Sequence, residues 1–447
     1  MKLIKKYLNR LELNPPRVLA LGFGALILFG ALLLNLPIAT KTGESIGFIN
    51  SLFTSASAVC VTGLVVVNTA EYWSLFGQIV IIILIQMGGL GFTTMATIVA
   101  LLLGKKITLK ERLIIKEQLN QETMSGLVKL TRYVIFSTFL IEGIGALLLS
   151  TRFIPKFGLN KGIWFSIFHA ISAFCNAGFD IIGDSIAPFV GDFIINITIG
   201  FLIIIGGLGF TVYIDISRNK GFKKLSLHSK LVITITAILV IGGMLVFFMT
   251  EKNNPDTLLN LTGKERVLAS FFQSAITRTA GFYSVDISKL YDTTVFIMII
   301  LMYIGGSPGS TAGGIKTTTF GTILFTTIAV IKGDKDVVVF NKRLSQDIIN
   351  RSLAIASIGL ILVISVSVLL TLTEEATFLD LLFETTSAFG TVGLTRGVTP
   401  NLSDVGKLII TLTMYAGRVG PLTMAFAFAQ RQKPVLYRHS EGNIMVG

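Results

Sequence analysis

Apolar runs divide the chain into alternating long and short segments. Eight runs are long enough to cross a bilayer, since about 20 helical residues span its ~30 Å hydrocarbon core. These runs are 18–37, 72–103, 129–150, 192–215, 230–250, 292–331, 351–372 and 403–430. Between them lie four shorter, half-apolar stretches, 46–60, 163–176, 265–278 and 377–390. A helix of about 14 residues rises only ~20 Å, so these stretches predict re-entrant half-helices.

The pattern of span, half-helix and span occurs four times. It predicts an all-α polytopic membrane protein with eight transmembrane spans, in which four in-chain repeats surround a central pseudo-fourfold pore. The predicted parts are an interfacial N-terminus (1–17), repeat one (18–103), a cytoplasmic loop with repeat two (104–215), repeat three (216–331), repeat four (332–430) and a cytoplasmic tail (431–447). The run 18–37 is too long for a typical signal-peptide core and lacks a clear small-x-small cleavage site, so we interpret it as the first span.

Composition and charge support a membrane protein with a defined orientation. Charged residues make up 14% of the 447 residues, against about 25% in a soluble protein, and the mean hydropathy is +0.76. The net charge of +13 does not indicate nucleic-acid binding, because 25 of the 38 Lys and Arg residues lie in alternate loops and the termini. The positive-inside rule places these segments, and both termini, in the cytoplasm of a multi-pass cell-membrane protein. The half-helices then enter from outside.

Each short stretch ends in a glycine-centred loop. The four loops align on Gly63, Gly178, Gly281 and Gly393. Ten residues earlier stands a phenylalanine (Phe53, Phe168, Phe271, Phe383), six earlier a small residue (Ser57, Ser172, Ala275, Ser387), and one later a large apolar residue (Leu64, Phe179, Phe282, Leu394). One such loop could be a tight turn at the membrane interface. Four loops with matching positions favour a shared function.

That shared function is cation binding by backbone carbonyls. A filter replaces the hydration shell of an ion with carbonyl oxygens that face one axis, and glycine adopts the required backbone conformation at no steric cost. Half-helices that aim their negative C-terminal ends at the pore would favour a cation. Non-helical backbone at membrane depth is tolerated where it lines a water-filled path or is packed in protein.

Further glycines follow 24–28 residues after each filter glycine. In repeats one and two, Gly88-Gly89-Leu90-Gly91 and Gly206-Gly207-Leu208-Gly209 favour close helix packing, with a hinge as the alternative. Repeat three extends the motif over residues 304–314, where five glycines and Pro308 among ten residues exclude a stable helix. A loop there must line the aqueous cavity, so we expect a mobile gate below the filter. Its residues are Gly305, Gly306, Ser307, Pro308, Gly309, Ser310, Thr311, Ala312, Gly313 and Gly314.

Several charged residues fall at membrane depth. Arg418, at the matching position of repeat four, is a functional candidate: we expect it to hold the gate through carbonyls or hydroxyls, with pairing to Glu384 or Glu142 as the alternative. Lys316 either adds positive charge to the cavity or reaches the cytoplasmic surface. Arg278 is expected to point behind the third filter loop and brace it, against an acidic residue.

The remaining polar groups predict structural roles. His169 and Glu384, nine residues before their filter glycines, are expected to hydrogen-bond behind the filter rather than relay protons. Cys60 and Cys175 are expected to be small residues that offer carbonyls, because a disulfide across the pore would occlude it. Neither cysteine belongs to a cluster with metal-ligand spacing.

At these residues the chain resembles the membrane subunit of a Ktr-type K⁺ uptake system, in the Trk/Ktr/HKT superfamily of cation transporters. The resemblance covers residues 12–447. It implies that K⁺ binds carbonyls of the filter residues, and that Na⁺ is a possible coupled ion. These residues are Val61, Thr62, Gly63, Asn176, Ala177, Gly178, Thr279, Ala280, Gly281, Thr391, Val392 and Gly393. Some plant relatives that favour Na⁺ carry serine at the position of Gly63, so glycine there supports K⁺.

The resemblance also implies that the gate at 305–314 is opposed by Arg418. Pro308 departs from the loop of many relatives, which have more Ala and Ser. The expected partners are a second copy of the chain and a cytosolic ring of regulatory chains that bind ATP or ADP. The sequence itself contains no nucleotide-binding glycine motif and predicts no organic cofactor. The basic loops 104–132 and 214–230 are candidate contacts for the ring, with solvated loops as the alternative.

Two other functions compete with a K⁺-conducting uptake subunit. A secondary transporter of another small solute often has inverted repeats and broken helices, whereas these repeats share one topology. An intramembrane enzyme would need a nucleophile with a base, or paired carboxylates. The three histidines and scattered acidic residues offer neither, so we do not expect an enzyme.

Overall fold

The computed structural model describes residues 15–91 and 127–420, with isolated residues 94, 113, 116, 423, 424, 442 and 445. Some sequence predictions therefore fall outside the described residues. They are the interfacial helix before residue 15, most of the basic loop 104–132, the last parts of the runs 72–103 and 403–430, and nearly all of the tail 431–447.

Four long apolar helices open four successive units of the chain. They are α2 (Pro15–Leu34), α8 (Leu127–Phe157), α12 (Leu227–Glu251) and α16 (Gln346–Leu370). Among the described residues, these four are the helices long and apolar enough to cross a membrane as single segments. Their sequence explains their ends in part: Ser226 caps α12 by accepting a hydrogen bond from the Ser229 amide (3.2 Å), which satisfies a free backbone donor.

A short helix follows in each unit, at each of the four predicted stretches. These short helices are α3 (Phe48–Cys60), α9 (Leu159–Phe174), α13 (Gly263–Ile276) and α17 (Phe378–Gly390). The phenylalanines ten residues before the filter glycines anchor them: Phe53, Phe168 and Phe383 are fully buried, and Phe271 is half-buried. The apolar residues one after the glycines are also buried. The aligned positions thus form the packing core around the loops.

The third helical segment of each unit is interrupted or ends at glycine, which corrects the prediction of long continuous runs. The segments are α5 (Leu75–Leu90), α10 (Phe193–Leu208) with α11 (Phe210–Arg218), α14 (Asp292–Tyr303) with α15 (Thr317–Lys332), and α18 (Asp404–Val419). Between α10 and α11 the chain bends by 90°. Gly91, Gly209 and Gly420 end α5, α10 and α18 with φ values of 82°, 94° and 93°, a conformation that glycine adopts without strain.

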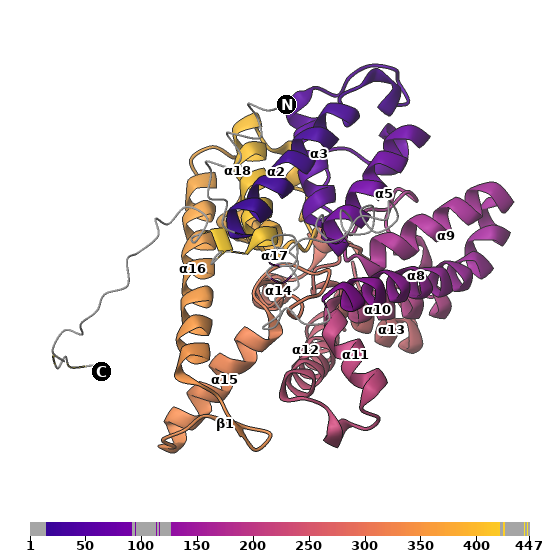
Figure 1. The fold of residues 1–447 in the computed structure, drawn as a ribbon. Coiled ribbons are helices and arrows are strands. Elements are labelled where there is room, and N and C mark those ends of the chain that lie inside the picture. Colours follow the sequence, from indigo (N-terminus) through magenta and orange to yellow (C-terminus); the bar gives the residue numbers. More distant parts are fainter. Residues whose placement is uncertain are drawn as a thin grey trace.

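The units pack on one another in a closed order. Besides its contacts within a unit, α5 packs on α9, α10 on α13, and α14 on α17. The ring closes because α18 packs on α3 of the first unit. In Figure 1 the colours accordingly follow one another around the molecule, from indigo α2 through magenta α8 to yellow α18. The four filter loops lie inside this ring.

Small residues allow these helices to approach closely, as predicted for repeats one and two. A methyl group added at Gly88 would collide with the carbonyl of Val59, and one added at Gly206 would collide with the carbonyl of Phe174. A methyl group added at Gly417 would likewise collide with the carbonyl of Phe389. Each carbonyl belongs to the residue four before the filter glycine, so the packing prediction is confirmed. The chain also bends by 90° at Gly209, and hinge motion at these glycines stays a prediction.

The remaining elements are short. They comprise α4 (Thr69–Tyr72), strands β1 (Val338–Val339) and β2 (Lys342–Arg343), and 3-10 turns at Pro37–Ala39, Ala187–Phe189, Phe222–Lys224, Ile287–Lys289 and Thr399–Asn401. The strands pair antiparallel through a two-residue turn in which Phe340 and Asn341 have φ values of 48° and 60°, as a type I′ hairpin requires. Figure 1 shows this hairpin at the lower end of α15 and α16.

The glycine contacts predict a measurable packing cost. Gly88→Ala should lower the apparent melting temperature in detergent, because the added methyl must displace the backbone of α3, and overpacking costs about 1–3 kcal/mol. Gly143→Ala on α8 is the matched control, since nothing lies within 4 Å of its added methyl. That control should leave the temperature unchanged or raise it slightly, because alanine favours helix. Equal melting temperatures for the two variants would contradict the packing role.

Candidate functional site

The four filter glycines form a closed ring. A methyl group added at Gly63, Gly178, Gly281 or Gly393 would meet, in that order, the carbonyl oxygens of Ala177, Ala280, Val392 and Thr62. Each loop therefore contacts the next, and the fourth contacts the first. A methyl at Gly281 would also lie 3.3 Å from the carbonyl oxygen of Thr62 in the opposite loop. The space inside the ring is too narrow for any side chain, which explains why all four positions are glycine.

The backbone is left-handed at two positions in each loop. The glycines have φ values of 96°, 68°, 67° and 88°. Two residues earlier, the non-glycine residues Val61, Asn176, Thr279 and Thr391 have φ values of 58°, 60°, 68° and 51°. Left-handed backbone is unfavourable for β-branched residues and persists only where the surroundings impose it. The sequence signal, one glycine per loop, revealed only half of this pattern.

Hydrogen bonds hold the amide groups of the loops and orient their backbone. The amides of Thr62, Ala177 and Val392 donate to the carbonyls of residues 57, 172 and 387, at 2.8, 2.7 and 2.8 Å. This six-to-one bond is the helix C-terminal pattern that accompanies a left-handed residue. The hydroxyls of Ser57 and Ser387 accept from the amides of Gly63 and Gly393, at 3.0 and 3.1 Å. In these two loops the serine six residues before the glycine thus accepts a hydrogen bond, a role that the alignment of the four loops did not reveal.

The third loop departs from the others. Ala275 replaces the serine, and the amide of Ala280 donates to Ile276 (3.1 Å), one residue nearer than in the other loops. The buried side chain of Arg278 donates through Nη2 to the carbonyl of Gly305, at 3.2 Å. It forms no ion pair among the described residues. The expected acidic partner is therefore wrong, because a gate-loop carbonyl takes its place.

An open cavity of about 370 Å³ adjoins the glycine ring. All four filter glycines line it, together with the carboxylates of Asp180, Asp184 and Asp286. These carboxylates give the cavity a negative potential that attracts cations.

The loop between α14 and α15 packs against the filter. Its ends meet in a parallel bridge between Ile304 and Ile315. The amides of Ser307 and Thr311 donate to the carbonyls of Gly207 (2.9 Å) and Gly206 (3.3 Å) at the end of α10. Added methyl groups at Gly313 would meet the side chain of Thr391 in the fourth filter loop. The loop thus occupies space directly next to the filter residues.

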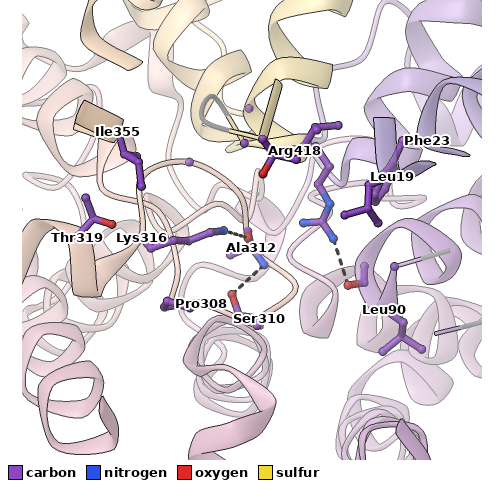
Figure 2. Close-up of a pocket in the computed structure, with 18 of the residues that line it drawn as sticks. Leu19, Phe23, Leu90, Pro308, Ser310, Ala312, Lys316, Thr319, Ile355 and Arg418 are labelled. Atoms are coloured by element: carbon purple, nitrogen blue, oxygen red, sulfur yellow. Dashed lines mark hydrogen bonds between the residues drawn. The ribbon is translucent and has the colours of Figure 1, made fainter. Parts of the chain in front are cut away.

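Arg418 joins the gate loop to the end of α5. Its guanidinium donates to the carbonyl of Thr311 and to those of Gly88 and Gly89, the last at 3.1 Å. Among the described residues it pairs with no carboxylate, so the expectation of carbonyl contacts is confirmed and the carboxylate alternative is wrong. The bonds to α5 were not predicted. Figure 2 shows Arg418 approaching the backbone next to Leu90 across the pocket.

Lys316 turns back to the gate loop. Its Nζ donates to the carbonyl of Ala312 at 2.8 Å, and Figure 2 shows the side chain pointing into the pocket rather than away from it. Lys316, Arg351 and Arg418 line this cavity of about 210 Å³, together with Pro308, Ser310 and Ala312. The interpretation in which Lys316 adds positive charge to the cavity is therefore the one that agrees with the structure.

Two buried polar residues near the filter, His169 and Glu384, make hydrogen bonds. Nδ1 of His169 lies 2.7 Å from the carbonyl of Phe165 within an aromatic shell. Glu384 accepts hydrogen bonds from Thr395 (2.7 Å) and Thr399, which follow the fourth filter glycine. The predicted hydrogen bonding of both residues is therefore present, and the absence of a proton relay stays a prediction. Cys60 and Cys175 are buried free thiols.

Sequence reasoning missed two polar links. Gln86 on α5 donates to Glu142 on α8 at 3.1 Å, next to Cys175. Asn176 connects the second and third filter loops with the gate loop. A signal for Asn176 exists, because it carries the one carboxamide among the four residues two before the filter glycines. No sequence signal identifies the contact of Gln86.

Comparisons with known proteins agree with this geometry. The TrkH family, described as "Cation transport protein", matches residues 26–435. The chain is 45% identical over 442 residues to Ktr system potassium uptake protein B of Bacillus subtilis, covering 99% of each chain. It is 44% identical over 453 residues to the potassium/sodium uptake protein NtpJ of Enterococcus hirae, covering 100% of each.

A solved structure shares the fold. The crystal structure of the potassium transporter TrkH from Vibrio parahaemolyticus matches with a TM-score of 0.72 at 17% identity, covering 92% of this chain and 83% of that one. The several apolar helices are those of a multi-pass membrane protein, and the matched family transports cations, which confirms that the chain is not an enzyme. The chain therefore belongs to the TrkH cation transport protein family, as a Ktr/Trk-type transporter subunit.

Proposed function

We propose that the chain is the ion-conducting subunit of a K⁺ uptake system, which moves K⁺ into the cell through a four-loop selectivity filter. The observation that carries this proposal is the closed ring of glycines, in which each loop presents a carbonyl beside the glycine of its neighbour. Rings of backbone carbonyls replace the hydration shell of a bare cation. The filter residues are 61–63, 176–178, 279–281 and 391–393.

The direction of the backbone supports carbonyl coordination. In all four loops the amide before the glycine donates to a carbonyl of the short helix, so carbonyls rather than these amides remain free for an ion. The left-handed residues at two positions per loop turn successive carbonyls toward one side. The C-terminal ends of α3, α9, α13 and α17 meet these loops, and such helix ends carry partial negative charge that favours a cation.

The relatives favour K⁺ as the ion. The relative from Bacillus subtilis is named a potassium uptake protein, and the solved structure is that of a potassium transporter. NtpJ is named a potassium/sodium uptake protein, so we include Na⁺-dependent symport in the proposal. Glycine at position 63 supports K⁺ over Na⁺, because serine stands there in some Na⁺-favouring relatives.

The gate comprises residues 305–314 and Arg418. The loop packs against the filter at Thr391, and Arg418 ties it to α5. An ion that leaves the filter toward the cavity must pass this loop and the positive charges of Lys316 and Arg418. Movement of the loop away from Arg418 opens the path.

The membrane arrangement is part of the proposal. Eight spans in four repeats, with the domain limits given above, surround a pseudo-fourfold axis in the cell membrane. The cyclic packing from α5 on α9 to α18 on α3 supports this arrangement, and the basic loops support cytoplasmic termini.

We also propose a homodimer of this chain on a cytosolic ring of separate regulatory chains that bind ATP or ADP. The name of the Bacillus subtilis relative, which assigns that protein to a Ktr system, supports the presence of partner chains. The hairpin of β1 and β2 lies at the end of α15 and α16 and carries Lys342 and Arg343. We therefore add this hairpin to loop 214–230 as a second basic segment that could contact the ring.

Gly63→Ser should reduce K⁺ discrimination several-fold. Gly63 has a φ of 96°, and a side chain there meets the carbonyl of Ala177, so the ring must widen. Competition of Na⁺ with Rb⁺ uptake in a K⁺-uptake-deficient cell measures the change. Gly43→Ser is the matched control: φ is 74°, but nothing lies within 4 Å, so discrimination should stay at the wild-type value. Unaltered competition in Gly63→Ser would mean that the first loop is not a filter.

Arg418→Gln should increase Rb⁺ flux in liposomes. The substitution removes the positive charge and the bonds that join Thr311 to Gly88 and Gly89, and a charged hydrogen bond contributes about 1.5–3 kcal/mol, which corresponds to at least about a tenfold change in the open population. Arg152→Gln removes a partly exposed ion pair with Asp192 and should leave flux unchanged. Flux that stays at the wild-type level in Arg418→Gln would argue against the gate.

A further inference from the structure

Asn176 is the most connected side chain of the filter. It lies two residues before Gly178, is fully buried, and has a φ of 60°. Its Nδ2 donates to the carbonyls of Ile203 on α10 (3.2 Å) and Arg278 in the third loop (3.1 Å). Its Oδ1 accepts from the hydroxyl of Thr311 in the gate loop, at 2.9 Å. One carboxamide thus touches two filter loops and the gate.

The residues equivalent to Asn176 in the other three loops make no such link. The equivalent residues are Val61, which has no polar side-chain atom, and Thr279 and Thr391, whose buried hydroxyls have no hydrogen-bond partner. Arg278 of the third loop donates to the carbonyl of Gly305 in the gate loop, but among these four equivalent positions Asn176 alone bonds both to a neighbouring filter loop and to the gate loop. Side-chain hydrogen bonds at a left-handed asparagine also stabilise that backbone conformation, because asparagine tolerates it better than β-branched residues do.

Thr311 is the matching centre of the gate loop. Its amide donates to Gly206 (3.3 Å), and its carbonyl accepts from Arg418. Its hydroxyl lies 3.1 Å from the carbonyl of Phe174 and 2.9 Å from Oδ1 of Asn176, and shares its single proton between them. If the gate loop moves away, both buried acceptors lose this donor. An unsatisfied buried group costs about 1–3 kcal/mol.

We infer that Asn176 is a positioning residue that couples the gate to ion selectivity, so that the gate loop sets the geometry of the second and third filter loops. This inference rests on the proposed function. When Thr311 leaves, the carboxamide reorients to regain a partner, and its hold on the carbonyl of Arg278 changes. Because coupling between two sites is reciprocal, ions in the filter also bias the gate.

The test measures two quantities on the full chain in liposomes: Rb⁺ flux and the K⁺/Na⁺ permeability ratio. Thr311→Val removes the hydroxyl and keeps the shape, so it should raise flux and lower the ratio by roughly fivefold or more, as for typical coupling between sites. Thr311→Ser retains the hydroxyl and should restore the ratio. Ser307→Ala is the matched gate variant: it removes a hydroxyl bonded to Thr317 (2.7 Å), away from Asn176, and should alter flux without altering the ratio.

Asn176→Gly provides an independent arm. Glycine keeps the left-handed backbone and removes only the carboxamide, so the ratio should fall as in Thr311→Val. The double variant should show no further fall, since both substitutions break the same link.

Two results would overturn the coupling and leave the gate intact: a raised flux with an unchanged ratio in Thr311→Val, or additive losses in the double variant. A fall in the ratio for Asn176→Gly alone would assign Asn176 a role inside the filter only, which also overturns the coupling. A wild-type protein that conducts neither K⁺ nor Rb⁺ would instead overturn the proposed function, a result distinct from the others.

Discussion

The structure depends on backbone that must leave regular helix inside the membrane and still find partners for its polar groups. In the hydrocarbon core an unpaired amide or carbonyl costs several kcal/mol. The filter loops meet this constraint asymmetrically. Their amides bond back to the short helices, as Thr62 does to residue 57 and Gly63 to the hydroxyl of Ser57, and their carbonyls face the ring. The gate loop meets it through the carbonyls of Gly206 and Gly207 and the guanidinium of Arg418.

Much of the fold could be predicted from apolar pattern and glycine spacing. The four short helices lie where their length and half-apolar composition placed them, and the glycine clusters pack against them because small residues permit it. The breaks at Gly91, Gly209 and Gly420 could not be predicted. The hydrophobic pattern of a straight helix is the same as that of a bent one. The point where each helix ends depends on neighbouring carbonyls and on the gate loop, as at Gly209, which lies beside the carbonyl of Pro308.

The candidate site could also be predicted only in part, because the sequence marks just one of the two left-handed positions in each loop. Glycines mark one left-handed position per loop, whereas Val61 and Thr391 adopt the other against their own preference. Tertiary packing imposes that conformation, so local sequence carries no trace of it. The predicted acidic partner of Arg278 was wrong. The prediction rested on the positive charge of the side chain alone, whereas the structure places a backbone carbonyl of the gate loop within hydrogen-bond distance. The contact of Arg418 with a carbonyl of the loop between α14 and α15 was predicted, but its second anchor on α5 depends on a contact 330 residues away in sequence.

The closed packing order has a consequence for biosynthesis. The first short helix, α3, packs on α18, and Tyr415 of α18 donates to the carbonyl of Ala20 at 2.6 Å. The last helix of the ring is also the last of these to leave the ribosome, so α3 must wait for most of the chain before it gains this neighbour. Until then one side of α3 lacks the neighbour on which it packs in the complete ring. The ring therefore closes only late in membrane insertion, and a chain that stops before α18 leaves the first short helix without this neighbour.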